Sequence, residues 1–141
     1  MFFRLGLLKG STEFQPSSDL GIVLNNACLE CFVLHLRNLL DFFYGESRKT
    51  DVCAAMFYES GKVPGDFPSE SDALKEAHRR AHKEMSHLTT ERLWAGDQRK
   101  AWNVSQLMKE VKILLEKFLQ TASTARLHPD VIQRANQFVQ A

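Results

Sequence analysis

The longest apolar helical pattern in the chain, residues 18–44, is the feature that most limits what this sequence can fold into. Ser17, Ser18 and Asp19 offer N-caps at its start, and Gly45 stands where a left-handed residue commonly ends a helix. Between these ends, apolar side chains at helical spacing occupy nearly the whole circumference. A helix of this kind must be covered on several sides, so the sequence predicts a central helix packed among others.

Three further helices follow from the same periodicity. Residues 71–90 begin with a Ser71-x-x-Leu74 cap signal, and their core stripe consists of Leu74, Ala77, Ala81, Met85 and Leu88. Asn103 and Gln106 form a capping-box start for a third helix that continues to about residue 125, and Pro129 begins a short tail helix. The predicted fold is all-α, an antiparallel up-and-down helical bundle in which the two longest helices flank the helix at 71–90.

Length and composition favour one domain in a reducing compartment. A chain of 141 residues that is 44% hydrophobic can bury one core, which we place in residues 18–141, with residues 1–17 as an N-terminal arm. A net charge of +1 argues against strong non-specific binding to nucleic acid. No apolar stretch reaches the roughly 20 residues of a membrane span, and three cysteines make no disulfide framework. We therefore expect a cytoplasmic protein without a membrane partner.

The helix at 71–90 carries three of the five histidines, and its periodicity sorts them into two groups. Arg80, Glu84 and His87 share one flank of the apolar stripe, whereas His78 and His82 share the other. Arg80 and His87 are seven residues apart, roughly 10 Å along the helix axis, which is too far for both to hold one phosphate. The two would face each other if the helix packed antiparallel against a second copy, so the spacing favours a homodimer.

The segment Arg80-Ala-His-Lys-Glu-Met-Ser-His87, preceded by CLECFVLHLRNLLDFF, resembles the Arg-to-His motif and preceding helix of the HEPN superfamily. The resemblance implies a metal-independent endoribonuclease of toxin or defence type, with RNA as substrate, a homodimeric site and a cognate protein partner. Arg80 would hold the phosphate and His87 would transfer the proton, roles that suit a planar guanidinium and an imidazole. The resemblance also implies supporting polar residues, for which the candidates are Glu30, His35, Asn38, Asp41, His82 and Glu84.

The chain departs from the family pattern at Ala81, where many members have a polar residue directly after the arginine. His82 could replace that polar group, although it lies on the other flank. Members without activity act as binding modules, so a non-catalytic interaction or dimerisation module remains the alternative function.

The same polar residues also have structural interpretations. Arg80 could pair with Glu84, Arg37 with Asp41 at the helical i,i+4 spacing, and His35 could belong to a buried network.

Metal binding is the weaker alternative, and we predict no cofactor and no metal. Cys28-x-x-Cys31 has zinc-like spacing but lies inside the long helix with no second pair. His78-x-x-x-His82 has the spacing of two helical metal ligands, and a third ligand would come from His35 or Glu30. That arrangement would make a metal-dependent bundle hydrolase.

Overall fold

The computed structural model of the chain describes residues 19–45, 50–86 and 101–140, and these residues are mostly helical and contain no strand. The all-α expectation is confirmed. The helices of the described residues are α1 (Asp19–Tyr44), α2 (Asp72–Ser86), α5 (Val104–Thr121) and α6 (Pro129–Gln140), with short 3-10 helices η1 (Ala54–Phe57) and η2 (Thr124–Arg126).

The long helix α1 ends at Tyr44, as the sequence predicts. Gly45 follows it, but for a reason other than the predicted left-handed conformation. Gly45 N–H donates to the Asp41 carbonyl at 2.9 Å, and Gly61 is the described glycine with a positive φ. A Cβ added to Gly45 would lie 2.5 Å from the Asp41 carbonyl oxygen. The expectation of a left-handed residue at Gly45 is therefore wrong, because close approach of the backbone selects glycine at this position.

Caps predicted from the sequence begin the other helices. Asn103 accepts a hydrogen bond from the Gln106 N–H at 3.2 Å, which starts α5, and Pro129 is the first residue of α6. The α5 helix ends at Thr121, a few residues before the predicted end.

The hydrophobic core lies where three helices meet. α1 contributes every third or fourth side chain, and α2 and α5 supply the facing stripes: Leu29, Val33, Leu36, Leu40 and Phe43 from α1, Leu74, Ala77 and Ala81 from α2, and Leu107, Val111, Leu114 and Phe118 from α5. Ala77 and Ala81 are small and nearly inaccessible, which lets the α2 backbone approach α1 closely.

Aromatic rings close one end of this core. Phe118 lies within 6.0 Å, centroid to centroid, of each of four rings: Phe42, Phe43, Phe57 and Tyr58. Phe67 contacts Phe43 at 5.4 Å. Phe57 and Phe67 thus attach the connection between α1 and α2 to the core.

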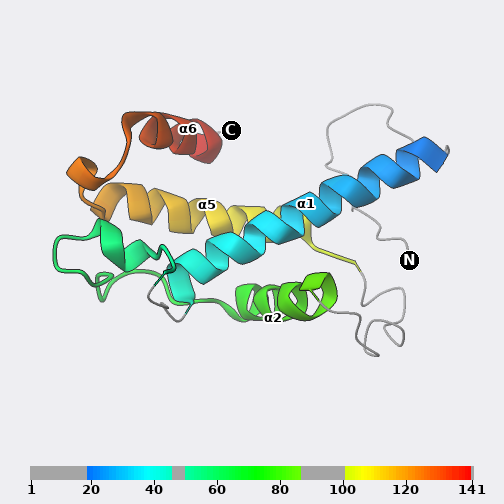
Figure 1. Ribbon diagram of the computed structural model, residues 1–141, viewed down its shortest axis with the longest axis horizontal. Helices are drawn as coiled ribbons and strands as arrows, with labels where there is room; N and C mark the ends of the chain where they lie inside the picture. The colour runs from blue at the N-terminus through cyan, green and yellow to red at the C-terminus, as the bar shows by residue number, and fades with distance from the viewer. Residues whose placement is uncertain (1–18, 46–49, 87–100, 141) are drawn as a thin grey trace.

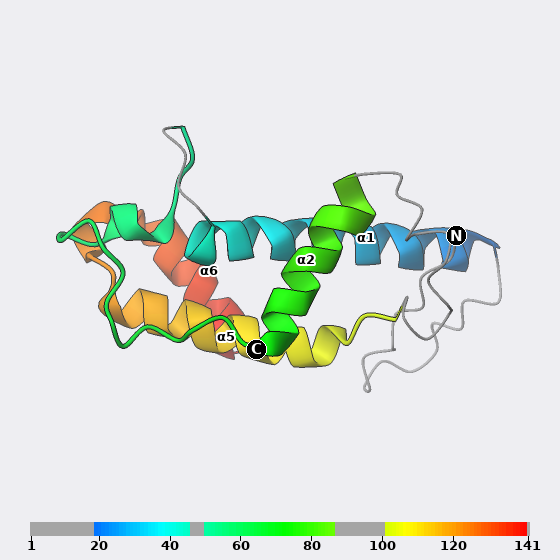
Figure 2. The ribbon, with the colours of Figure 1, turned by 90° about the horizontal axis from the view of Figure 1, so that it is seen from below.

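In the view of Figure 1, α1 and α5 run from right to left, and α2 and α6 run from left to right. Figure 2 shows that α2 crosses α1 obliquely and does not lie alongside it. The crossing brings the middle of α2 against the C-terminal half of α1, whereas the N-terminal half of α1 extends past α2 and α5 (Figure 1).

By length and composition alone, α1 could cross a membrane, which differs from the sequence expectation. Core helices of soluble proteins pass the same test, and the C-terminal half of α1 supplies much of the core described above. The helix also has exposed apolar side chains, Leu20, Val23, Leu24 and Leu34.

Candidate functional site

The start of α2 fixes which side chains meet α1. The Ser71 hydroxyl oxygen accepts the Leu74 N–H at 3.1 Å, which confirms the predicted cap, and α2 begins at Asp72. Ala77 and Ala81 then face the core, so the residues that follow each of them, His78 and His82, lie at the edge of the contact between the two helices.

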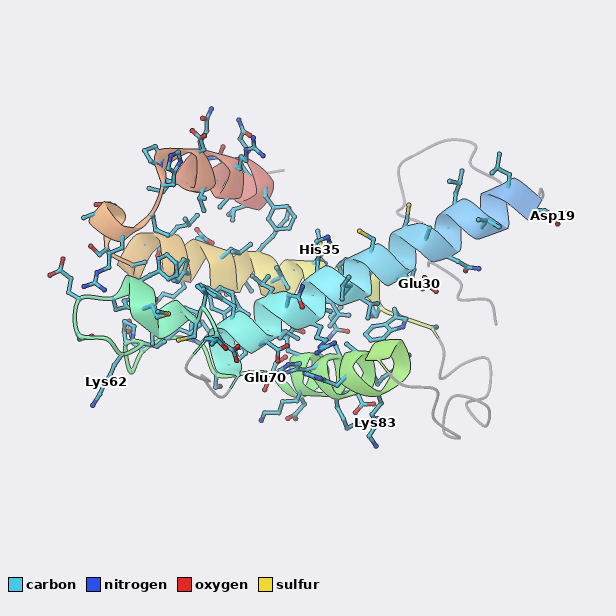
Figure 3. The ribbon with its side chains drawn as sticks, viewed as in Figure 1. Asp19, Glu30, His35, Lys62, Glu70 and Lys83 are labelled. Atoms are coloured by element: carbon cyan, nitrogen blue, oxygen red, sulfur yellow. The ribbon has the colours of Figure 1, made fainter. Side chains whose placement is uncertain are left out.

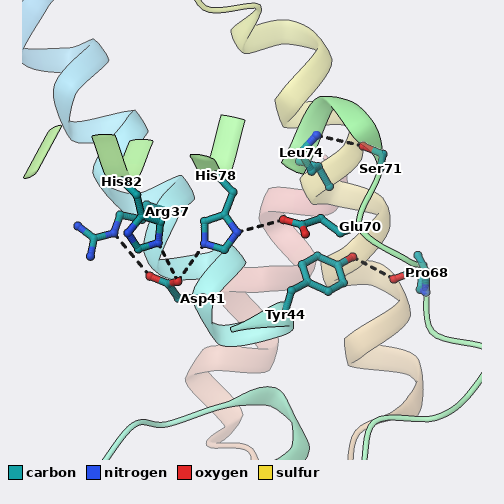
Figure 4. A network of polar contacts seen from close by, with 9 residues as sticks. All are labelled: Arg37, Asp41, Tyr44, Pro68, Glu70, Ser71, Leu74, His78 and His82. Atoms are coloured by element: carbon teal, nitrogen blue, oxygen red, sulfur yellow. Dashed lines mark hydrogen bonds and ion pairs between the residues drawn. The ribbon is translucent and has the colours of Figure 1, made fainter. Parts of the chain in front are cut away.

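Asp41 of α1 meets both histidines (Figure 4). Its Oδ1 lies 2.9 Å from His78 Nε2 and 3.2 Å from His82 Nε2, and the two rings are 5.0 Å apart, centroid to centroid. On the same helix, Arg37 Nε lies 3.6 Å from Asp41 Oδ2, so the predicted intrahelical pair is confirmed. The cluster thus joins a carboxylate, two imidazoles and a guanidinium across the α1–α2 contact.

Glu70 adds a second carboxylate from the segment that leads into α2 (Figures 3 and 4). Its Oε1 lies 3.1 Å from His78 Nδ1, and both side chains are mostly buried. His78 therefore has a carboxylate oxygen at each ring nitrogen, and a neutral imidazole has an N–H at only one of them.

The charges around Asp41 decide its ionisation. Burial by itself would raise the pKa of Asp41, but hydrogen bonds and charge interactions with His78 and His82 outweigh it and hold the pKa below its usual value of 3.8. Asp41 therefore stays a carboxylate at neutral pH.

This lowered pKa predicts an acid-dependent loss of stability. A carboxylate whose pKa is lower in the folded protein stabilises the fold above its unfolded pKa, and this contribution disappears as pH falls through the folded value. In EDTA, Asp41→Asn should therefore unfold at lower urea concentration than the unmodified protein at pH 5 to 6, and the difference should shrink below about pH 4. Urea titrations followed by circular dichroism measure it. An equal difference at pH 6 and pH 3 would contradict the assignment.

Two further hydrogen bonds hold the segment that leads into α2. The Tyr44 hydroxyl donates to the Pro68 carbonyl at 3.0 Å, and Ser71 donates to Glu110 of α5. Burial, with the nearby charges of Glu70 and Glu110, raises the pKa of Tyr44 to about 12. Tyr44 is consequently a neutral donor at physiological pH that holds the segment preceding α2 against α1.

Arg80 lies away from this cluster, on the side of α2 that faces the start of α5. Its guanidinium carbon is 4.2 Å from the centroid of the buried Trp102 ring, and Nη1 donates to the Ala101 carbonyl at 3.2 Å. Asp41 instead contacts His78, His82 and Arg37. His87 and the side chain of Glu84 lie outside the described residues, so their expected positions stay predictions.

Several sequence interpretations need correction. His35 is exposed on α1, so the buried network expected for it is wrong, and Glu30 and Asn38 are exposed as well. The third side chain beside His78 and His82 is Asp41, in place of the expected His35 or Glu30. Cys28 and Cys31 are free and exposed.

The sequence interpretation did not assign Glu70 or Tyr44 to the site. The only sequence signal for Glu70 is its position just before the predicted helix, where a favourable interaction with the helix dipole is sufficient to explain an acidic residue.

Comparison of the chain with protein-family models, with curated proteins and with solved structures finds no match. A function must therefore be argued from the chemistry of the described residues and from the sequence motif.

Proposed function

We propose that the chain is a HEPN-like helical-bundle protein of the cytoplasm that cleaves RNA without a metal ion, at a site shared between the two copies of a homodimer. The observation that supports this proposal best is the fixed position of Arg80. A guanidinium that stacks on a buried indole and donates to a backbone carbonyl loses little further freedom when it binds a phosphate. Arg80 would hold the scissile phosphate of RNA.

The proton transfer would come from the second copy. With α2 antiparallel to its symmetry mate about an axis near Lys83, Arg80 of one chain faces His87 of the other. Arginine stabilises the extra charge of the pentacovalent transition state, and histidine activates the ribose 2′-hydroxyl or protonates the leaving oxygen. Lys75 and Lys83 of α2 add positive charge that favours approach of an anionic chain.

The alternative proposal, from another class, is a non-catalytic helical interaction module. Exposed apolar side chains on α1 favour it: Leu20, Val23 and Leu24 in the N-terminal half are between 46% and 67% exposed. Side chains of this size at neighbouring positions are suited to a protein partner or a second copy.

Replacing Arg80 tests the ribonuclease proposal directly. In buffer with EDTA, Arg80→Ala and His87→Ala should each lower the rate of cleavage of a single-stranded RNA by about 100-fold or more, because each removes transition-state stabilisation. Arg79→Ala is the matched control, since Arg79 is the adjacent arginine but pairs with Glu76 through two hydrogen bonds of 2.8 and 2.6 Å. Equal rates in Arg80→Ala, His87→Ala and the unmodified protein would exclude the catalytic role and leave the interaction module.

Mixing the two inactive variants tests the shared site. A mixed dimer of Arg80→Ala and His87→Ala chains contains one site with both residues intact and one with neither. Random exchange should therefore restore roughly a quarter of the original rate. If the site lies within one chain, the mixture stays inactive, and a monomer by analytical ultracentrifugation contradicts the proposal.

A further inference from the structure

We infer that Asp41, His78 and His82 form a binding site for a divalent transition-metal ion such as Zn²⁺, with three protein ligands and one open coordination position. His78 and His82 stand one helical turn apart on α2, and Asp41 comes from the facing side of α1. Two histidines at i,i+4 and one carboxylate from a second helix are a ligand set that zinc prefers. The ligand atoms of these three residues lie within 4.8 Å of one another.

Two of the three ligand separations are already close to those of a zinc site. Bonds of about 2.0–2.1 Å to a tetrahedral zinc place two ligand atoms about 3.4 Å apart. Asp41 Oδ1 lies 2.9 and 3.2 Å from the two Nε2 atoms, so those contacts need to open by only a few tenths of an ångström. The ligand nitrogens of His78 and His82 lie within 4.8 Å of each other, so this third separation would close by at most about 1.4 Å.

The distances from Asp41 to the two histidines are also those of hydrogen bonds. The other contacts of His78, however, favour a metal ion. With a metal at Nε2, the single N–H of a neutral imidazole sits on Nδ1 and donates to Glu70, 3.1 Å away. A carboxylate behind a histidine ligand is the usual outer partner in zinc sites, where it fixes the ring and its tautomer. Arg37 plays a similar part for Asp41, because it approaches Oδ2 and leaves Oδ1 toward the histidines.

Exposure is graded across the three ligands. The His78 side chain is 17% exposed, whereas those of Asp41 and His82 are 40% and 45% exposed. His78 and Glu70 thus form a fixed inner side, and the other two ligands are accessible from solvent. An ion could enter from that side and keep a water molecule in the open position.

This inference goes beyond the proposed ribonuclease, since the two sites use different flanks of α2. Arg80 is directed toward Trp102 and Ala101 near the start of α5, whereas His78 and His82 contact α1. Metal binding can therefore succeed or fail independently of RNA cleavage.

The experiment measures Zn²⁺ binding by the full chain, freed of metal with EDTA and desalted, in competition with a chromophoric chelator. The unmodified protein should bind one Zn²⁺ at this site, and His82→Ala should weaken that binding by more than about 100-fold. His82 is exposed, so the variant should fold, and circular dichroism checks this. Glu70→Gln should weaken binding by about 10- to 100-fold, as loss of an outer carboxylate does.

Two controls separate this site from other zinc ligands. His35→Ala removes an exposed histidine of α1, and Cys28→Ser with Cys31→Ser removes the two exposed thiols. Both should bind Zn²⁺ as the unmodified protein does, and Co²⁺ in its place should give the visible spectrum of a nitrogen- and oxygen-ligated ion. Absence of Zn²⁺ binding, or equal binding by His82→Ala, would overturn the inference, as would loss of binding in the cysteine variant.

Discussion

Phe118→Ala should lower the free energy of unfolding by about 3–5 kcal/mol, the cost expected when a buried aromatic ring is removed from a packed core. Phe118 is 5% exposed and contacts four aromatic rings that come from α1 and from the connection between α1 and α2. The substitution therefore removes the one ring of α5 that joins these segments in the aromatic cluster. Guanidinium chloride unfolding followed by circular dichroism measures the change.

Phe138 provides the comparison for this variant. It is half-buried on α6, and the Lys112 ammonium lies 5.6 Å from the centroid of its ring. Phe138→Ala should cost clearly less than Phe118→Ala, because the same ring leaves a more open site that water can fill. If the two substitutions cost the same, the cluster around Phe118 does not hold the described helices together.

Helix positions were predictable because their signals are local. Asn103 with Gln106, Ser71 with Leu74 and the proline at 129 each satisfy or avoid backbone donors within one turn, and the structure keeps all three starts. Gly45 shows the limit of such reasoning. Its identity marks the helix end correctly, but the sequence cannot distinguish a left-handed conformation from close backbone approach, and only the latter applies.

The partners across α1 and α2 were not predictable in the same way. A helical wheel gives the bearing of each side chain but not the height at which two helices cross. Here the small side chains of Ala77 and Ala81 set the crossing point, and Asp41, one residue after the fully buried Leu40, then lies opposite His78 and His82. Asp41 had a local explanation in its pair with Arg37 and was a candidate supporting residue, but no sequence signal linked it to His78 or His82.

The prediction of a buried network for His35 was wrong for a related reason. The wheel of α1 is apolar nearly all round, so the pattern does not say which sides the other helices cover. In the structure Val33 and Leu36 are buried while Leu34 and His35 between them are exposed. Burial on this helix depends on where α2 and α5 lie, which is information that comes from tertiary packing and not from the period of the helix.

Leu40→Ala and Leu34→Ala make the same substitution at a buried and at an exposed position of α1. Comparing their stabilities tests which side of the helix the other helices cover. Leu40 is 0% exposed and Leu34 is 44% exposed, and both lie well inside the helix. Alanine has a helix propensity at least as good as that of leucine, so any large loss must come from packing. Leu40→Ala should cost about 2–5 kcal/mol in free energy of unfolding, whereas Leu34→Ala should stay within about 0.5 kcal/mol.

The comparison also reports on the exposed side of α1. Urea unfolding at several protein concentrations would reveal a second copy, because an interface that buries Leu34 makes stability depend on concentration. A large cost for Leu34→Ala that grows with concentration would then place Leu34 in a dimer interface. The same cost at every concentration would instead mean that Leu34 is covered within one chain, contrary to the exposure described above. A small cost for Leu40→Ala would contradict the packing of α2 against α1, and with it the geometry that brings Asp41 to the two histidines.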